Sequence, residues 1–172
     1  MQRILGFLFI LLGCGGLGVW YGEQYREQVR TLRQFIHILE LFEAEIRYGK
    51  CLLAECCLKL SEKLEEPYRS LFREIYQKNM EYSGESFGDI CRRSMERGMK
   101  DVVVKAEDKE LLVSCFEKSG YEEDTLQLRI IEQTKKQLEQ RLECVSRENL
   151  SKYRVAIGMG MMSGLLLVIL LV

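Results

Sequence analysis

Residues 22–48 read GEQYREQVRTLRQFIHILELFEAEIRY, and this stretch decides the fold. Its apolar residues recur every three or four positions, the spacing that places them on one face of a helix. The recurring positions are Val29, Leu32, Ile36, Leu39, Phe42 and Ile46. No proline or glycine interrupts the stretch after Gly22, so we expect one long amphipathic helix that ends near Gly49.

Further helices are expected downstream, because apolar residues return at helical spacing between successive turn signals. The second helix covers about Leu52–Leu64, and the third has Pro67, the only proline in the chain, in its first turn. Ser86, with Asp89 three positions later, has the spacing of a capping box. This pair predicts the start of the fourth helix.

The fifth helix is expected to begin at Asp108, whose carboxylate can accept from the first backbone N–H groups. It should end at Ser119-Gly120, where a glycine follows the last apolar turn. The β-branched run Val102–Val104 lies before it, and we expect this run to be extended.

The last helix should begin at Asp124 and carry an apolar heptad pattern that Lys135 breaks. No glycine or proline occurs before Gly158, so the helix should continue toward the C-terminal end. The positions of the pattern are Leu128, Ile131, Leu138, Leu142 and Val145. Together the patterns predict an all-α, antiparallel bundle of about six helices, although a heptad repeat can also mark packing onto a second chain.

Charge is confined to the middle of the chain. The sequence has 25 Lys or Arg and 26 Asp or Glu, and all of them except Arg3 lie between Glu23 and Arg154. The near balance of the two signs argues against a basic nucleic-acid-binding protein. The middle, residues 23–154, is long enough for one water-facing domain with a modest core.

The two ends are uncharged and apolar. Ile4–Tyr21 reads ILGFLFILLGCGGLGVWY, and Val155–Val172 reads VAIGMGMMSGLLLVILLV. An 18-residue helix is about 27 Å long, close to the hydrocarbon thickness of a bilayer. We therefore expect an N-terminal transmembrane helix within residues 1–22, a bundle over residues 23–154 and a C-terminal transmembrane helix over residues 155–172.

Pairs of glycines four residues apart occur in both apolar ends, at Gly18 with Gly22 and at Gly160 with Gly164. This spacing allows membrane helices to approach closely, so these four residues are candidates for helix packing within the bilayer. Glycine without a dedicated partner is an equally good interpretation of either pair.

The N-terminal segment allows three other interpretations. A cleaved signal peptide is disfavoured, because the apolar run is long and no A-x-A-like cleavage site follows it. Leu11-Leu12-Gly13-Cys14 resembles a bacterial lipobox, which would make the chain a lipidated protein with an extracytoplasmic helical domain. Residues 13–18, GCGGLG, match the G-x-G-x-x-G pattern of a dinucleotide-binding turn. That turn needs a sheet of β-α units, and the rest of the chain offers only Val102–Val104 as a β-branched run. A nucleotide-using membrane enzyme is therefore disfavoured.

Basic residues predict which side of the membrane the middle faces, because cytoplasmic segments are enriched in Lys and Arg. The basic residues close to the apolar ends are Arg26, Arg30, Arg33, Lys135, Lys136, Arg141, Arg147, Lys152 and Arg154. The seven cysteines, an odd number with no C-x-x-C pair, are typical of a reducing compartment. Both observations favour a cytoplasmic bundle.

Residues for catalysis are scarce. His37 is the only histidine, and its apolar neighbours suggest a packing residue. Glu40, Glu43 and Glu45 are more simply explained as a solvated helix face than as acid–base groups. The chain has no G-x-x-x-x-G-K-[ST] motif, and its cysteines lack the spacing of a zinc site. We expect no enzymatic activity, metal or cofactor.

Scattered positions along nearly the whole chain resemble the stage III sporulation protein AB family. They are Leu32-Arg33, Glu45–Gly49 (EIRYG), Leu53, Gly120 before Asp124, Lys152-Tyr153-Arg154 and Gly158, between the two apolar ends. The sequence departs from the family at Ser119-Gly120, where relatives usually have Leu-Gly.

The resemblance implies a mother-cell membrane protein of the channel complex that links mother cell and forespore. It also implies likeness to the F-type inner-membrane platform proteins of type II secretion and type IV pili. The implied partners are a cytoplasmic secretion-type ATPase and other stage III sporulation membrane proteins, with a homo-oligomer left open. Candidate contact residues on the long first helix are Arg33, Glu45 and Tyr48.

Overall fold

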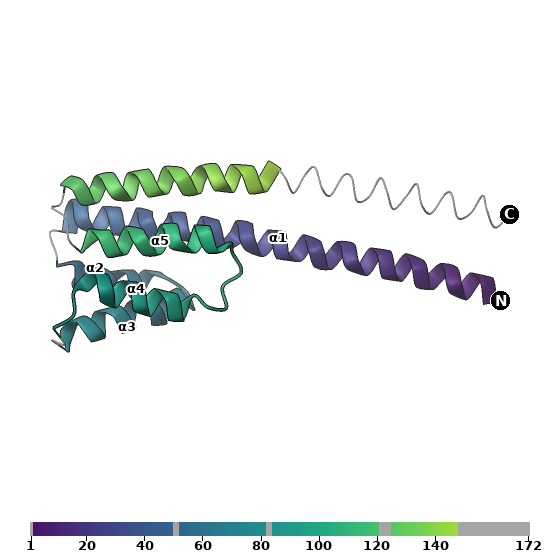
Figure 1. Ribbon diagram of the computed structural model, residues 1–172, viewed down its shortest axis with the longest axis horizontal. Coiled ribbons are helices and arrows are strands. Elements are labelled where there is room, and N and C mark those ends of the chain that lie inside the picture. The colour runs from purple at the N-terminus through teal and green to yellow at the C-terminus, as the bar shows by residue number, and fades with distance from the viewer. Residues whose placement is uncertain (1, 50–51, 82–83, 121–124, 148–172) are drawn as a thin grey trace.

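The computed structural model describes the backbone of residues 2–49, 52–81, 84–120 and 125–147, and the side chains of these ranges from residue 26 onward. The described residues form six helices and no strand, which confirms the all-α prediction (Figure 1). The helices are α1 (Gln2–Gly49), α2 (Leu53–Lys63), α3 (Tyr68–Met80), α4 (Phe87–Gly98), α5 (Ala106–Ser119) and a last helix over residues 125–147.

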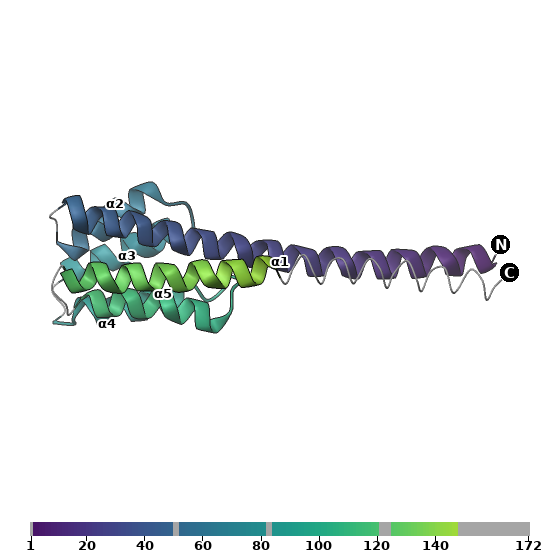
Figure 2. The ribbon, with the colours of Figure 1, turned by 90° about the horizontal axis from the view of Figure 1, so that it is seen from above.

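Successive helices run in opposite directions, and α1 lies beside the last helix (Figures 1 and 2). The hairpins α2–α3 and α4–α5 complete the bundle around the C-terminal half of α1. The N-terminal half of α1 projects far beyond the other helices. We call the end of the bundle from which it projects the proximal end, and the end where α1 stops at Gly49 the distal end.

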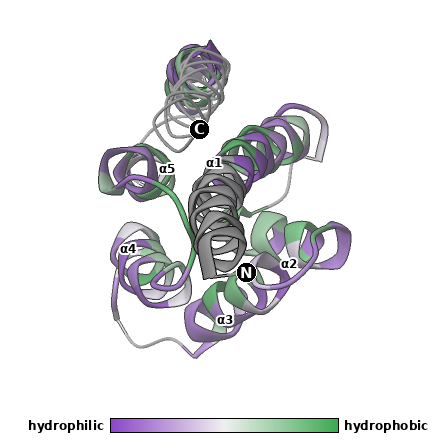
Figure 3. Cartoon of the chain, turned by 90° about the vertical axis from the view of Figure 1, so that its right-hand side faces the viewer, coloured by the Kyte–Doolittle hydropathy of each residue, from purple (hydrophilic) through white to green (hydrophobic). Residues whose placement is uncertain are grey.

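An aromatic cluster joins three helices at the centre of the core. The rings of Phe42 in α1 and Phe116 in α5 stack with centroids 4.4 Å apart, and Phe72 in α3 lies 5.3 Å from Phe116. All three side chains are fully buried. Seen end-on, the hydrophobic residues of the helices face inward and the hydrophilic ones outward (Figure 3).

The buried face of α1 is wider than the sequence pattern predicts. Leu32, Leu39 and Phe42 are fully buried, as expected, but Phe35 and Ile38 are fully buried too. Val29, Ile36 and Ile46 are only partly buried. The face is broad because other helices cover α1 on more than one side, whereas a single 3–4 spacing describes contact with one neighbour.

The capping box at α4 is confirmed. The Ser86 hydroxyl accepts the backbone N–H of Asp89 at 3.2 Å, and it donates to the Asp89 carboxylate at 2.6 Å. At α3, Pro67 marks the helix start as expected, but it is the N-cap, one position before the first helical residue Tyr68, rather than a residue of the first turn.

The predicted cap of α5 is wrong. The helix begins at Ala106, after Lys105, which makes no side-chain cap. Asp108 lies instead in the first turn, fully buried, and accepts a hydrogen bond from Nε of Arg141 in the last helix at 2.9 Å. The error has a physical reason: an ion pair across 33 positions leaves no local pattern from which it could be inferred.

The end of α5 follows the prediction, with Ser119 as its last residue and Gly120 as the C-cap. The Ser119 hydroxyl donates to the carbonyl of Cys115 at 2.8 Å, and the Gln127 amide donates to the carbonyl of Ser119 at 2.7 Å. A Cβ at Gly120 would lie 2.9 Å from the backbone nitrogen of Gly88, so glycine is required by close packing of the turn on α4.

The run Val102–Val104 forms no strand and lies in the connection between α4 and α5. Val102 and Val104 are partly buried against the core, while Val103 between them is 47% exposed. The alternation fits a short extended segment that covers the edge of the core.

In the part of the chain where side chains are described, no helix is long and apolar enough to cross a membrane.

The backbone of the predicted N-terminal segment is helical, as part of α1. The surroundings of Gly18 and Gly22, and the whole of residues 155–172 with Gly160 and Gly164, lie outside the described side chains and residues. The two transmembrane assignments stay predictions.

Replacing Phe116 by alanine should destabilise the full-length protein by about 3–5 kcal/mol, because the side chain packs against two other aromatic rings and its loss leaves a cavity. Urea unfolding in detergent, followed by circular dichroism, measures the change. Leu52→Ala is the matched control: Leu52 is 72% exposed, so this variant should change stability by less than about 0.5 kcal/mol. Similar losses for both variants would contradict the described core.

Candidate interaction surfaces

Lys135, the residue that breaks the heptad pattern, pairs with Glu43 of α1 at 2.9 Å. Both side chains are largely buried, with 23% and 16% of their surface exposed. The hydrogen bond that Lys135 donates to the Glu43 carboxylate raises the pKa of Lys135. Glu43 also accepts from Arg47 at 2.7 Å, so one carboxylate connects the last helix to the end of α1.

Glu45 occupies an equivalent position on the α2 side. Its two carboxylate oxygens accept from Lys63 at 2.7 Å and from Lys59 at 3.0 Å, and the side chain is 12% exposed. The hydrogen bond from Lys63 is the largest cause that lowers the pKa of Glu45. The expected solvated acidic face therefore holds for Glu40, which is 54% exposed, but not for Glu43 and Glu45.

The three candidate contact residues do not form one site. Glu45 is engaged within the bundle, while Arg33 and Tyr48 are exposed and separated by about 22 Å along α1, at 1.5 Å per residue. Tyr48 is 80% exposed at the distal end, whereas Arg33 lies toward the proximal end. Their roles as contact residues stay predictions.

The distal end carries most of the exposed large apolar side chains of the described residues. These distal apolar residues are Tyr48 (80% exposed), Leu52 (72%), Met80 (43%) and Leu126 (40%), and they stand at helix ends that meet there. Val103, at 47%, lies at the proximal end. The sequence pattern did not single out Leu52, Met80 or Leu126, because their exposure depends on where neighbouring helices begin and end.

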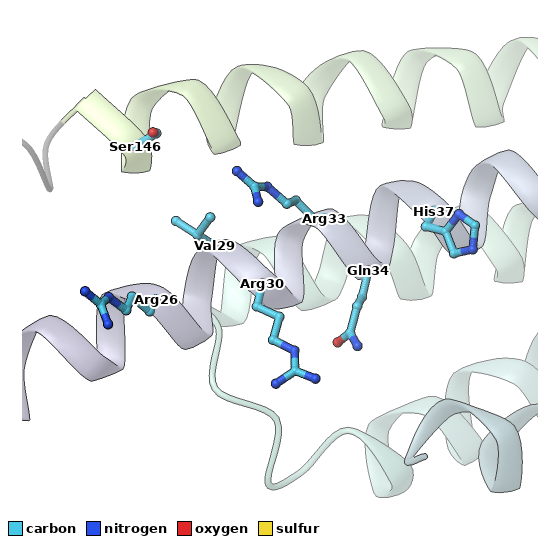
Figure 4. A pocket seen from close by; sticks show the side chains of 7 residues that line it. All are labelled: Arg26, Val29, Arg30, Arg33, Gln34, His37 and Ser146. Carbon is cyan, nitrogen blue, oxygen red and sulfur yellow. The ribbon is translucent and has the colours of Figure 1, made fainter. Parts of the chain in front are cut away.

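Toward the proximal end, α1 lines most of an open cavity of about 490 Å³, to which the last helix contributes one residue (Figure 4). We call it the proximal cavity. Its lining residues are Arg26, Val29, Arg30, Arg33, Gln34, His37 and Ser146. In Figure 4 the Arg33 side chain points toward the helix that carries Ser146, and Arg30 and Gln34 lie on the other flank of α1.

His37 is not the packing residue that its sequence neighbours suggested. Its side chain is 58% exposed, and Nδ1 lies 3.8 Å from the carboxylate of Glu40. The neighbours Phe35, Ile38 and Leu39 occupy the buried face, and the helical turn places residue 37 outside it.

The described thiols have the properties of core residues. Cys56, Cys57, Cys91 and Cys115 are buried and form no disulfide, and Cys144 is exposed. Burial raises the pKa of Cys115 to about 11, and contact with Cys91 together with burial raises the pKa of Cys57. A thiol with a raised pKa is a poor nucleophile. The described residues include no group of three or more His, Cys, Asp or Glu that could hold a metal ion.

The fold and these surfaces define a class of protein: a helical bundle built on one very long helix, with ion pairs that fasten its helices together, an apolar distal end and a basic proximal cavity. The exposed features are suited to contacts with other molecules.

Comparison with known proteins gives the family. A family model described as "Stage III sporulation protein AB (spore_III_AB)" matches residues 3–172, and the chain belongs to this family. The resemblance noted from the sequence is confirmed, and with it a connection to sporulation.

Two relatives support the assignment. Stage III sporulation protein AB of Bacillus subtilis (strain 168) is 24% identical over 171 residues, which cover 99% of each chain. A solved structure of stage III sporulation protein AB (SpoIIIAB) is 22% identical, with a TM-score of 0.64 over 72% of this chain and 97% of that chain. This second likeness shows that the two chains share a fold.

Glu45 should make folding stability sensitive to acid. Because the pKa of Glu45 is lowered in the folded state, its ion pairs stabilise the fold fully at pH values above the ordinary glutamate pKa of 4.5. This stabilisation is lost as the pH falls through the lower pKa of the folded state. In Glu45→Gln, the free energy of unfolding should fall less steeply below pH 4.5 than in the unaltered protein. Urea titrations across this range measure the slope.

The matched control for that titration is Glu55→Gln, which removes one exposed carboxylate from α2. It should leave the acid slope unchanged. An identical slope for Glu45→Gln and the unaltered protein would show that the contacts with Lys59 and Lys63 do not stabilise the fold.

Proposed function

We propose that this chain is a non-enzymatic platform protein of the mother-cell membrane. In this role it links a cytoplasmic secretion-type ATPase to the membrane assembly of the channel between mother cell and forespore. Family membership supports a role in sporulation. The observation that carries the finer proposal is α1 itself, an uninterrupted helix of 48 residues, about 72 Å long.

A continuous helix of this length joins the apolar N-terminal segment to the distal end of the bundle without a hinge. A displacement at either end is then transmitted along hydrogen-bonded backbone rather than through a loop. The aromatic cluster and the Glu43–Lys135 pair fix the rest of the bundle to the same rod. Such an element can transmit position or force, and it needs no active site for this task.

A cytoplasmic location of the bundle is supported by charge and by sulfur chemistry. The arginines that follow the apolar segment favour the cytoplasmic side of a bilayer. The four buried thiols pack as small apolar groups, which suits a reducing compartment.

The proposed docking site for the ATPase is the distal end. It is the end farthest from the N-terminal segment, so a soluble partner can reach it beyond the membrane surface (Figure 1). The distal apolar residues are exposed to water, which is unfavourable for apolar side chains. A protein partner that binds there can cover them.

The alternative of a lipidated extracytoplasmic protein requires cleavage before Cys14. The backbone of α1 runs through this position as one helix from Gln2 to Gly49, which favours an intact spanning segment over a processed lipobox. Metabolic labelling with a radioactive fatty acid, abolished by Cys14→Ser, would support lipidation and contradict the platform proposal.

A proline at Glu27 should abolish spore formation. Glu27 is exposed and lies in α1 close to where the rod enters the bundle; proline there removes a helical hydrogen bond and kinks the rod. Proline at this position destabilises the helix locally by about 3 kcal/mol. The packing of the bundle core should be unaffected. Heat-resistant spores are counted in an endospore-forming host that carries the variant in place of its own gene.

Glu27→Ala is the control, because it removes the same charge and keeps the helix. It should sporulate normally. Normal spore numbers from the proline variant, at equal protein abundance, would show that continuity of α1 is not needed.

The double variant Tyr48→Ala, Leu52→Ala should capture at least about tenfold less of the cytoplasmic ATPase, because both side chains are exposed at the distal end and large apolar anchors dominate interface energies. Capture is measured with the full-length protein in detergent and the purified ATPase of the same host. Val103→Ala, at the proximal end, should capture the ATPase as well as the unaltered protein. Equal capture by all three would exclude the distal end as the docking site.

A further inference from the structure

The arginines of the proximal cavity form no ion pair with an acidic residue of the described chain, unlike Arg47 and Arg92. Arg47 pairs with Glu43 at 2.7 Å, and Arg92 pairs with Glu117 at 2.6 Å. Among the described residues, no carboxylate forms an ion pair with any of the cavity's three guanidinium groups, those of Arg26, Arg30 and Arg33. The cavity therefore gathers positive charge that the described part of the fold leaves uncompensated.

The other polar groups of the cavity can also donate hydrogen bonds. The Gln34 amide, the Ser146 hydroxyl and the ring of His37 line the same 490 Å³ as the three arginines. Guanidinium groups bind phosphate with paired, charge-assisted hydrogen bonds, and amides and hydroxyls add neutral donors. The donor set and the volume suit a phosphate ester that carries a small polar group.

The membrane-facing edge of the cavity lies at the level expected for the headgroup layer of a bilayer. If the hydrocarbon core ends near Gly22, Arg26 lies about 6 Å beyond it, Arg30 about 12 Å and Arg33 about 16 Å. A headgroup layer is about 5–8 Å thick on each side. Side chains on a helix tilt toward its N-terminus, so these long side chains reach back toward the membrane.

We propose that the proximal cavity binds the phosphate headgroup of an anionic phospholipid of the surrounding bilayer. This proposal rests on the membrane anchoring in the proposed function and adds a specific ligand to it. Anionic lipids are favoured over zwitterionic ones, because three guanidinium groups repel the cationic part of a choline headgroup. A headgroup bound in this cavity would set the depth and tilt of α1 in the membrane.

The test uses the full-length protein in nanodiscs that contain phosphatidylcholine with a minor fraction of phosphatidylglycerol. Phosphatidylglycerol retained per protein is measured by mass spectrometry after the bulk lipid is exchanged for phosphatidylcholine. The test variant is Arg26→Gln, Arg30→Gln, Arg33→Gln. The control variant is Arg73→Gln, Arg97→Gln, Arg129→Gln, which removes three exposed arginines outside the cavity and changes the net charge equally.

The unaltered protein and the control should retain phosphatidylglycerol in excess over phosphatidylcholine. In the cavity variant this enrichment should fall about fivefold for each arginine removed. Equal retention by the two triple variants would overturn the proposal. So would release of the lipid by excess inorganic phosphate, since that result would identify a site for the free anion. A cavity variant that keeps the lipid but loses an acidic protein partner would likewise overturn it.

Failure of the underlying anchor gives a different result. A chain that is not anchored is washed from vesicles by alkaline carbonate, whatever the lipid. A chain that stays with the vesicles and shows no lipid preference contradicts the lipid site alone.

Discussion

The bundle depends on the burial of a broad apolar face along the C-terminal half of α1. Phe35, Ile38, Leu39 and Phe42 are fully buried there, and Phe42 stacks on Phe116 of α5. Burying a side chain of this kind contributes about 1.5–3 kcal/mol, more than an exposed ion pair does. The ion pairs therefore select the arrangement of the helices, whereas the apolar contacts with α1 supply most of the stability.

The bundle is polarised along its long axis. The proximal cavity collects arginines where α1 leaves the bundle, and the distal end exposes apolar side chains where α1 stops. Between them, charged groups such as Glu43 and Glu45 are satisfied internally by lysines of neighbouring helices. A protein that connects two environments needs unlike ends and a stable middle, and this distribution of residues has both.

Features encoded within one turn of chain were predictable from the sequence, and features that depend on distant residues were not. The Ser86–Asp89 cap and the end of α5 at Gly120 depend on neighbours in the chain, and both predictions are confirmed. Asp108 was misassigned because its carboxylate pairs with Arg141 of another helix. His37 was misassigned because it lies one position outside the buried face of α1, and neighbouring helices determine how wide that face is. Of the candidate site, Arg33 and Tyr48 were correctly placed on the surface of the long helix, but a cavity between α1 and residue 146 has no sequence signature.

Lys135 has a consequence for how the two long helices can move. Its ammonium group meets Glu43 at one relative setting of α1 and the last helix. A slip of one turn, about 5.4 Å, would separate this largely buried pair and leave Glu43 with one cation fewer. Sliding of α1 along the last helix is therefore unfavourable. An axial force applied to either helix is then carried by both.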